Sequence, residues 1–252
     1  KIVSLYPNEN WFEIEKALRL QKIDNPKLLE KIIQDWLSPN IVKPTEAFVK
    51  HEKLNRIYEE AKKSERFKKY LQKFEPKASV AHLMFDIGNT KNESLADTHI
   101  PKESWIKIIF NKNIDWNNRP EIVVAYAFIH EVIHAEMYRQ LLEVANKNGS
   151  INTAKLEQYV KNNNKKELFN EYIKDQYSKD STNYQHNIMA KKYINVVVDF
   201  LKEMYGSNYT DKEYLTIVWM GVQNTDAWNN LQKKEREEYK KIWKEKYWSW
   251  KK

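Results

Sequence analysis

The spacing of apolar residues along this chain predicts a mainly helical protein. Between residues 45 and 74, apolar side chains recur every three or four positions, which is the pattern of a long amphipathic helix. The polar run at residues 62–64 is a candidate interruption of that helix. The same spacing predicts a second long helix from residue 180 to about residue 204, and two more helical pieces after residue 211. Most of the chain is therefore expected to be helical.

A leader of 43 residues precedes these segments. Two short helices are expected in it, over residues 11–20 and after Pro26, because proline is favoured in the first turn of a helix. Two breaks that contain proline then separate the leader from the rest of the chain. We therefore predict a helical N-terminal extension or linker, residues 1–43, followed by one large domain, residues 44–252.

Two segments change from helical spacing to the character of β-strands. Residues 80–87 and 105–110 are rich in β-branched and aromatic side chains, and a polar stretch separates them. No other segment has this character as strongly. The sequence therefore predicts an α+β fold that is mainly helical, with a small β-sheet packed on the helix that follows it.

The helix after this sheet carries the most informative motif in the chain. Asn117 or Asn118 is expected to cap it, Pro120 falls in its first turn, and it should end near residue 144. Apolar residues surround nearly the whole helix, which indicates that it is buried. Yet the segment His130-Glu131-Val132-Ile133-His134 places three ionisable residues within it. Such groups destabilise a protein interior unless they have partners.

The spacing of these three residues fits a zinc site with a catalytic base. Positions four residues apart lie on one face of an α-helix, so the imidazoles of His130 and His134 can bind one ion. Glu131 projects beside them, where its carboxylate can take a proton from a water molecule that Zn²⁺ activates. The alternative, two core histidines and a paired glutamate, needs a separate partner for each polar group. We therefore predict Zn²⁺ ligands at His130 and His134 and a general base at Glu131.

The third protein ligand that a catalytic zinc ion usually has must come from outside the motif. The continuation typical of metzincins is absent, since Met137 and Gln140 stand where that pattern has glycine and histidine. Only one histidine follows the motif: His186, near the start of the next long helix. We predict it as the third ligand. The other candidates are three earlier histidines, His51, His82 and His99, and three glutamates in a Lys- and Asn-rich segment, Glu157, Glu167 and Glu171.

Three further polar side chains are weaker candidates for stabilising charge in a transition state. Tyr193 lies seven positions after His186 and so on the same face of the predicted helix, where its hydroxyl could stabilise an oxyanion. A core role is nevertheless the commoner one for such a tyrosine. Tyr184 and Arg139 have still weaker claims to a similar role.

Composition narrows the kinds of site that the chain can form. The chain contains no cysteine, so any metal must be held by histidine and carboxylate. The net charge of +8 is due mostly to Lys beside Glu along helical segments, which favours a solvated surface over a nucleic-acid site. No apolar run approaches the length of a membrane-spanning helix. Neither nucleic-acid binding nor a transmembrane segment is therefore expected.

Three blocks of the sequence resemble a known family. They are FIHEVIHAEMYRQ at residues 128–140, NYQHNIMAKKY at 183–193 and VWMGVQNTDAWNNL at 218–231. Together they are similar to bacterial SprT-like zinc metallopeptidase domains, which belong to the zincins and are often found at the C-terminal end of larger, secreted or toxin-like proteins. The similarity extends over about residues 45–231.

The resemblance implies a zinc site and a peptidase activity. It implies Zn²⁺ ligands at His130, His134 and His186, with Glu131 as the base. The chain departs from the SprT and Spartan branch, which often carries a cysteine zinc module that a chain without cysteine cannot form. Repair of DNA–protein crosslinks is therefore not implied.

The sequence thus predicts a zinc metallopeptidase with a protein or peptide substrate, acting as a secreted effector or toxin domain. The main alternative is a binding or toxin-delivery module with a structural metal site, which a fourth protein ligand would close. A third hypothesis, a basic nucleic-acid-binding protein, predicts steeply salt-dependent binding. Location stays open between secretion as part of a larger protein and the cytoplasm.

Overall fold

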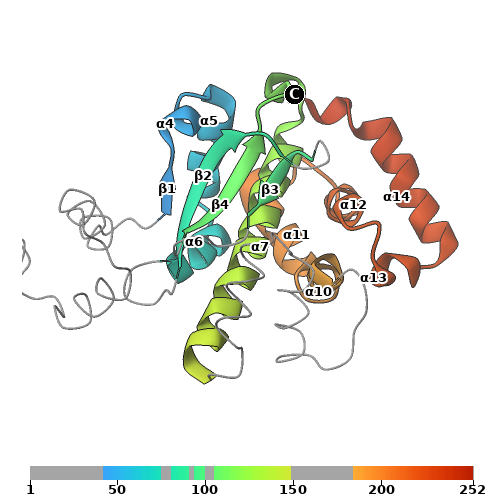
Figure 1. Ribbon diagram of the computed structural model, residues 1–252. Helices are drawn as coiled ribbons and strands as arrows, with labels where there is room; N and C mark the ends of the chain where they lie inside the picture. The colour runs from blue at the N-terminus through green and yellow to red at the C-terminus, as the bar shows by residue number, and fades with distance from the viewer. Residues whose placement is uncertain (1–41, 75–80, 91–93, 100–104, 149–183, 252) are drawn as a thin grey trace, which may run out of the picture.

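The computed structural model describes residues 42–251 apart from residues 75–80, 91–93, 100–104 and 149–183 (Figure 1). The described part of the chain is mainly helical and contains one small mixed sheet, which confirms the predicted α+β fold. The helices predicted in the leader lie outside the described residues. The boundary predicted near residue 43 falls within the first described strand, β1, Val42–Pro44.

The sheet has four strands in the order β1-β2-β4-β3. Strands β2, His82–Gly88, and β4, Trp105–Asn111, are the two that the sequence predicts, and they pair in parallel along their whole length. Strand β1 pairs in parallel with β2, while β3, Ala96–Thr98, pairs antiparallel with β4 at the other edge. The sequence did not predict β1 and β3, because a strand of three residues is too short to show an alternating pattern.

The prediction of one long helix over residues 45–74 is wrong. The segment forms three helices, α4, Glu46–Val49, α5, Glu52–Ala61, and α6, Glu65–Leu71, followed by the 3-10 turn η1, Gln72–Phe74. Each helix begins after a capping residue, Thr45, His51 or Ser64, whose side chain accepts a hydrogen bond from a backbone N–H three positions on. These caps replace the backbone bonds of a continuous helix. The interruption predicted at residues 62–64 is confirmed.

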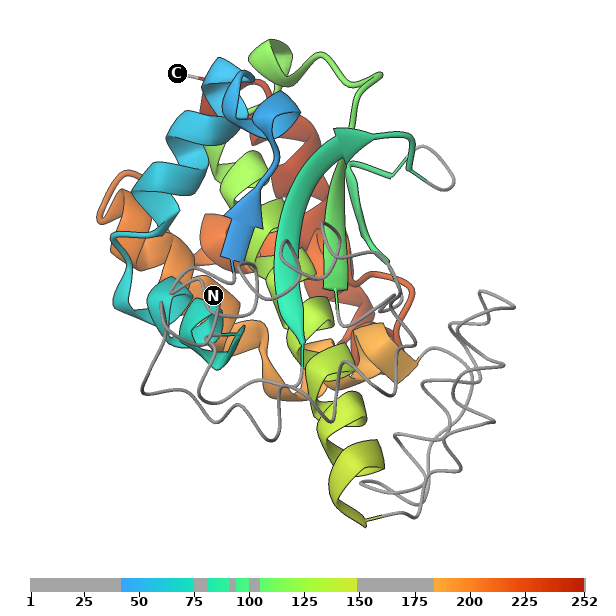
Figure 2. The same ribbon diagram turned by 60° about the vertical axis from the view of Figure 1, so that its left-hand side comes forward.

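Helix α7, Glu121–Asn148, carries the motif and packs on the sheet through β3 and β4. In Figure 2 it runs behind the sheet and its C-terminal part extends beyond it. Residues 122–139 are all buried, which confirms the burial predicted from the apolar residues around this helix. The predicted cap is wrong. Asn117 and Asn118 lie in the 3-10 turn η3, Trp116–Asn118, and the carbonyl of Pro120 accepts the N–H groups of Val123 and Val124.

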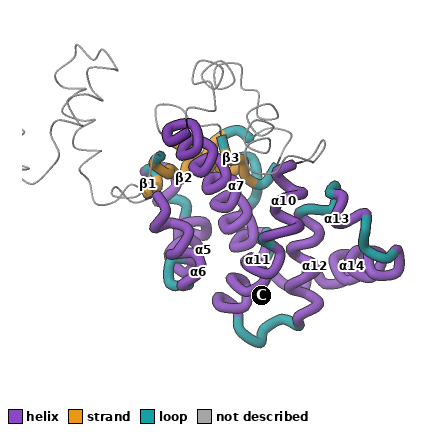
Figure 3. Tube along the Cα trace, turned by 90° about the horizontal axis from the view of Figure 1, so that it is seen from below, coloured by secondary structure: helices purple, strands orange, loops and turns teal. Residues whose placement is uncertain are grey.

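The C-terminal part of the chain is helical. It contains α10, Tyr184–Lys192, α11, Ile194–Tyr205, α12, Asp211–Gly221, α13, Asp226–Asn229, α14, Lys233–Lys246, and the 3-10 turn η4, Ser249–Lys251. Figure 3 shows α10, α11, α12 and α14 on one side of α7 and α5 and α6 on the other. Within the described residues, no helix combines the length and apolarity needed to cross a membrane.

The single helix predicted from residue 180 to about residue 204 is wrong, because the chain breaks at Tyr193 into α10 and α11. The Tyr193 ring packs against Tyr70, with 6.4 Å between ring centroids. Apolar spacing alone could not reveal this break, since both halves are helical.

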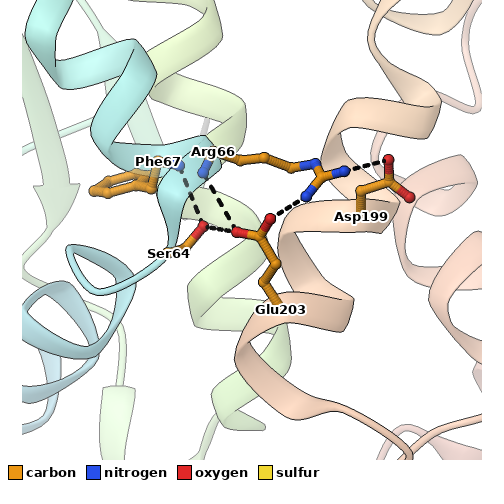
Figure 4. Close-up of polar contacts among 5 residues, drawn as sticks. All are labelled: Ser64, Arg66, Phe67, Asp199 and Glu203. Atoms are coloured by element: carbon orange, nitrogen blue, oxygen red, sulfur yellow. Dashed lines mark hydrogen bonds and ion pairs between the residues drawn. The ribbon is translucent and has the colours of Figure 1, made fainter.

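A cluster of polar side chains fastens α6 to α11 (Figure 4). Glu203 of α11 accepts hydrogen bonds from the Ser64 hydroxyl and the Arg66 backbone N–H, and it pairs with the Arg66 guanidinium. The same guanidinium contacts Asp199 at 3.0 Å. Because Ser64 also caps α6, the cluster holds the start of this helix against α11.

Replacing Glu203 by glutamine should reduce stability at neutral pH but not in acid. Burial raises the pKa of Glu203, yet the bonds from Ser64 and Arg66 lower it by more, so the net pKa is below 4.5. The folded state therefore binds fewer protons than the unfolded state, and the stabilisation present above pH 4.5 disappears as pH falls through the folded-state pKa. We expect the free energy of unfolding to decrease by roughly 0.5–1 kcal/mol at pH 7. Denaturant titrations at neutral and acid pH measure this, and an equal loss in both would contradict it.

Candidate metal centre

Three histidines from α7 and α10 lie close together. His130 and His134 of α7 and His186 of α10 each offer a nitrogen atom, and these atoms lie within 4.8 Å of one another. The Nε2 atoms of His130 and His134 are 3.0 Å apart, and the His186 ring centroid is 5.3 Å from each of the other two. Two nitrogen ligands of one tetrahedral zinc ion are about 3.3 Å apart. The cluster could therefore hold a single metal ion.

The spacing of four residues on α7 brings two of these histidines together. Hydrogen bonds made by the two neighbours of His186 position the third. The side chain of Asn187, the residue after His186, donates to Asp226 Oδ2 at 3.1 Å and accepts the Asp226 N–H at 2.7 Å. Asp226 is the first residue of α13. On the other side, Gln185 donates to the Tyr138 hydroxyl of α7 at 3.2 Å. His186 is therefore held between two anchored neighbours.

Burial favours the neutral form of two of these imidazoles, those of His130 and His186. It lowers the pKa of His130 well below 6.5, and a positive charge on the nearby His186 would lower it further. Burial also lowers the pKa of His186. Both rings therefore keep a lone pair for a metal ion at neutral pH. An ordinary histidine, by contrast, takes up a proton only slightly below that pH. Three imidazoles form a donor set that suits Zn²⁺ among other transition metals, so the residues fit such an ion.

Glu131 lies beside the histidines and is held by the sheet. The Thr98 hydroxyl of β3 is 2.6 Å from Glu131 Oε2 and 2.9 Å from the Glu131 carbonyl oxygen. Thr98 and Glu131 are both buried. The edge strand therefore orients the carboxylate that the sequence predicts as a base.

A pocket of about 390 Å³ lies over this cluster. Its wall includes the three histidines, Glu131, residues 94–98 in and before β3, and Gly221 at the end of α12. The histidines and the carboxylate thus face a space that a substrate could occupy, and β3 borders that space. The described residues of this wall include no lysine and no arginine.

The other histidines of the sequence lie elsewhere. His51 caps α5, the His82 ring packs against Trp105 with 4.8 Å between centroids, and the His99 N–H donates to the Lys107 carbonyl. The alternative glutamate ligands, Glu157, Glu167 and Glu171, lie outside the described residues, so the structure neither supports nor opposes them.

The weaker candidates for transition-state stabilisation are not among the described residues that line the pocket. Tyr193 lies at the break between α10 and α11, where its ring packs against Tyr70. Arg139 is buried and donates to Glu136, with 2.6 Å between Nε and Oε2. Tyr184 begins α10. The oxyanion role considered for Tyr193 therefore stays a prediction.

Four residues of this region were not predicted from the sequence: Thr98, Tyr126, Asn187 and Gly221. Tyr126 carries a detectable signal, because it precedes His130 by four positions and so lies on the same face of the helix. Gly221 is one of only four glycines in the chain. The roles of Thr98 and Asn187 arise from contacts with distant segments, for which a single sequence gives no signal.

Comparisons with known proteins add nothing to these observations. No family model, curated protein or solved structure matches this chain. The resemblance to SprT-like domains therefore stays a prediction.

Proposed function

We propose that this protein is a zinc-dependent peptidase. The observation that carries the proposal is the convergence of His130, His134 and His186 in one pocket with Glu131 beside them. The three histidines would hold the ion and leave a coordination position for water, as in catalytic zinc sites. When bound, Zn²⁺ would lower the pKa of that water and polarise the carbonyl of the bond to be cleaved.

Glu131 would transfer the proton. Its carboxylate would take a proton from the attacking water and deliver it to the leaving nitrogen of the peptide bond. This role requires a carboxylate with a defined orientation, and the bond from Thr98 to Oε2 supplies that orientation. The buried neighbours of Glu131 strengthen its electrostatic interactions with groups in the pocket.

The position of β3 supports a peptide as the substrate. It is the last strand in the order of the described sheet, and its residues line the pocket together with the histidines. Extended peptides commonly bind such edge strands through main-chain hydrogen bonds. A peptide aligned with β3 would bring one of its carbonyl groups to the histidine cluster. The resemblance to domains of secreted or toxin-like proteins extends the proposal to an effector that cleaves a target protein.

The second candidate is a binding or toxin-delivery module with a structural metal site. Structural zinc is normally closed by four protein ligands, whereas the group found among the described residues has three and faces a pocket. These two observations favour catalysis over a structural role.

Metal analysis combined with a cleavage screen tests the proposal. The purified protein should bind about one zinc ion per chain and cleave members of a peptide library. A chelator should abolish cleavage, and Zn²⁺ should restore it. Peptidoglycan, assayed in parallel, tests a cell-wall substrate. Zinc binding without cleavage of any peptide would support the structural alternative, and failure to bind a metal would refute the site itself.

A further inference from the structure

The two nitrogens of the His130 ring have different partners. Nδ1 is 2.8 Å from the hydroxyl oxygen of Tyr126, while Nε2 is 3.0 Å from Nε2 of His134. A neutral imidazole carries its proton on one nitrogen only, and the partner of that nitrogen decides which one it is. The contact with Tyr126 therefore bears directly on which nitrogen of His130 is available to a metal.

Gly221 makes room for Tyr126 in this position. A Cβ atom at residue 221 would lie 1.8 Å from the Tyr126 hydroxyl oxygen and 2.4 Å from Cζ, which no real structure tolerates. Gly221 is the last residue of α12, so at this point the backbone of α12 approaches the Tyr126 side chain of α7 with no side chain between them. Any larger residue at 221 would displace the tyrosine ring.

We propose that Tyr126, seated against Gly221, is a positioning residue for the metal site. In this assignment the Tyr126 oxygen accepts the Nδ1–H of His130, and Nε2 is left unprotonated and directed toward His134, as binding of an ion at Nε2 requires. The second nitrogen of a metal-binding histidine usually donates to a carboxylate, a carbonyl or water, and here a phenol from the same helix takes that place. The inference rests on the proposed function for the presence of the metal. The selection of the His130 tautomer does not depend on a metal.

The phenol differs from the usual carboxylate partner in one respect. Burial raises the pKa of Tyr126, and the charge of Glu131 raises it further, so the phenol stays neutral. It fixes the ring of His130 without adding a second negative charge beside Glu131. The phenol therefore adds no charge to the described pocket wall, which contains the carboxylates of Glu131 and Asp97.

The test uses Tyr126→Phe and Gly221→Ala in the full chain. The first removes only the hydroxyl, and the second displaces the ring without altering any polar group. Nitrogen-15 NMR of the metal-free protein reports the tautomer of His130, and competition with a chelator gives the affinity for Zn²⁺. We expect the Nδ1–H tautomer in the wild type, a mixture of tautomers in both variants, and about a 10- to 100-fold weaker affinity for Zn²⁺.

Two matched controls separate positioning from general damage. Tyr214→Phe removes another buried hydroxyl, which donates to the Gly206 carbonyl at 2.9 Å, and Gly88→Ala adds a methyl group whose nearest neighbour is an Ile109 methyl at 3.1 Å. Neither should change the tautomer or the zinc affinity.

Three results would overturn the proposal: an Nε2–H tautomer in the wild type, the same tautomer in Tyr126→Phe as in the wild type, or an unchanged zinc affinity in that variant. If Gly221→Ala does not fold, Tyr126→Phe alone decides. Failure of the wild type to bind zinc would refute the proposed function, and the tautomer comparison in the metal-free protein would still decide whether Tyr126 positions His130.

Discussion

Glu131→Gln is expected to lower kcat for peptide hydrolysis by about 10²- to 10⁴-fold, the usual contribution of a general base. Glutamine has nearly the shape of glutamate, and its side-chain oxygen can still accept the hydrogen bond from Thr98, which lies 2.6 Å from Oε2 in the structure. It cannot take a proton from water. The three histidines are unaltered, so zinc content should remain at the wild-type value.

Single-turnover hydrolysis of a peptide identified in the library screen, measured beside zinc content, gives both quantities. Glu121→Gln is a suitable control, since Glu121 lies on the same helix and pairs with Arg56 far from the pocket. Hydrolysis at the wild-type rate in Glu131→Gln would exclude the proposed base. Loss of zinc from that variant would instead indicate that Glu131 helps to hold the ion.

His186→Ala is expected to weaken zinc binding by more than about 100-fold, because the loss of a residue that only supports a ligand already costs about 10- to 100-fold. The change removes one of the three nitrogens that lie within 4.8 Å of one another and leaves a site with two. Hydrolysis should fall in parallel. Chelator competition measures the affinity, and circular dichroism shows whether α10 remains folded.

The same experiment distinguishes His186 from the alternative glutamate ligands. His51→Asn is the control, because His51 caps α5 away from the cluster and asparagine can take over the capping role. The third ligand would be a glutamate if His186→Ala keeps the wild-type zinc affinity and that affinity falls in Glu157→Gln, Glu167→Gln or Glu171→Gln. A loss only in His186→Ala would establish the three-histidine site.

Local periodicity determined what the sequence could predict of the fold and the site. The burial of α7 followed from apolar residues on all its faces, and the meeting of His130 and His134 followed from their spacing of four residues. Strands β2 and β4 were predictable because each is seven residues long and departs from helical spacing, and β4 is also rich in isoleucine and aromatic side chains. His186 could be chosen because it is the one histidine after the motif, near the start of a predicted helix.

Tertiary contacts decided what the sequence could not show. Thr98 reaches Glu131 across 33 residues of chain, and Asn187 meets Asp226 across 39. The approach of Gly221 to Tyr126 likewise joins two different helices. Hydrogen bonds and close packing between distant segments produce no periodic pattern of residues in a single sequence. The sequence by itself therefore determined the helix that carries the motif and its ionisable residues, whereas only the folded chain decided how those residues are oriented and which side chains support them.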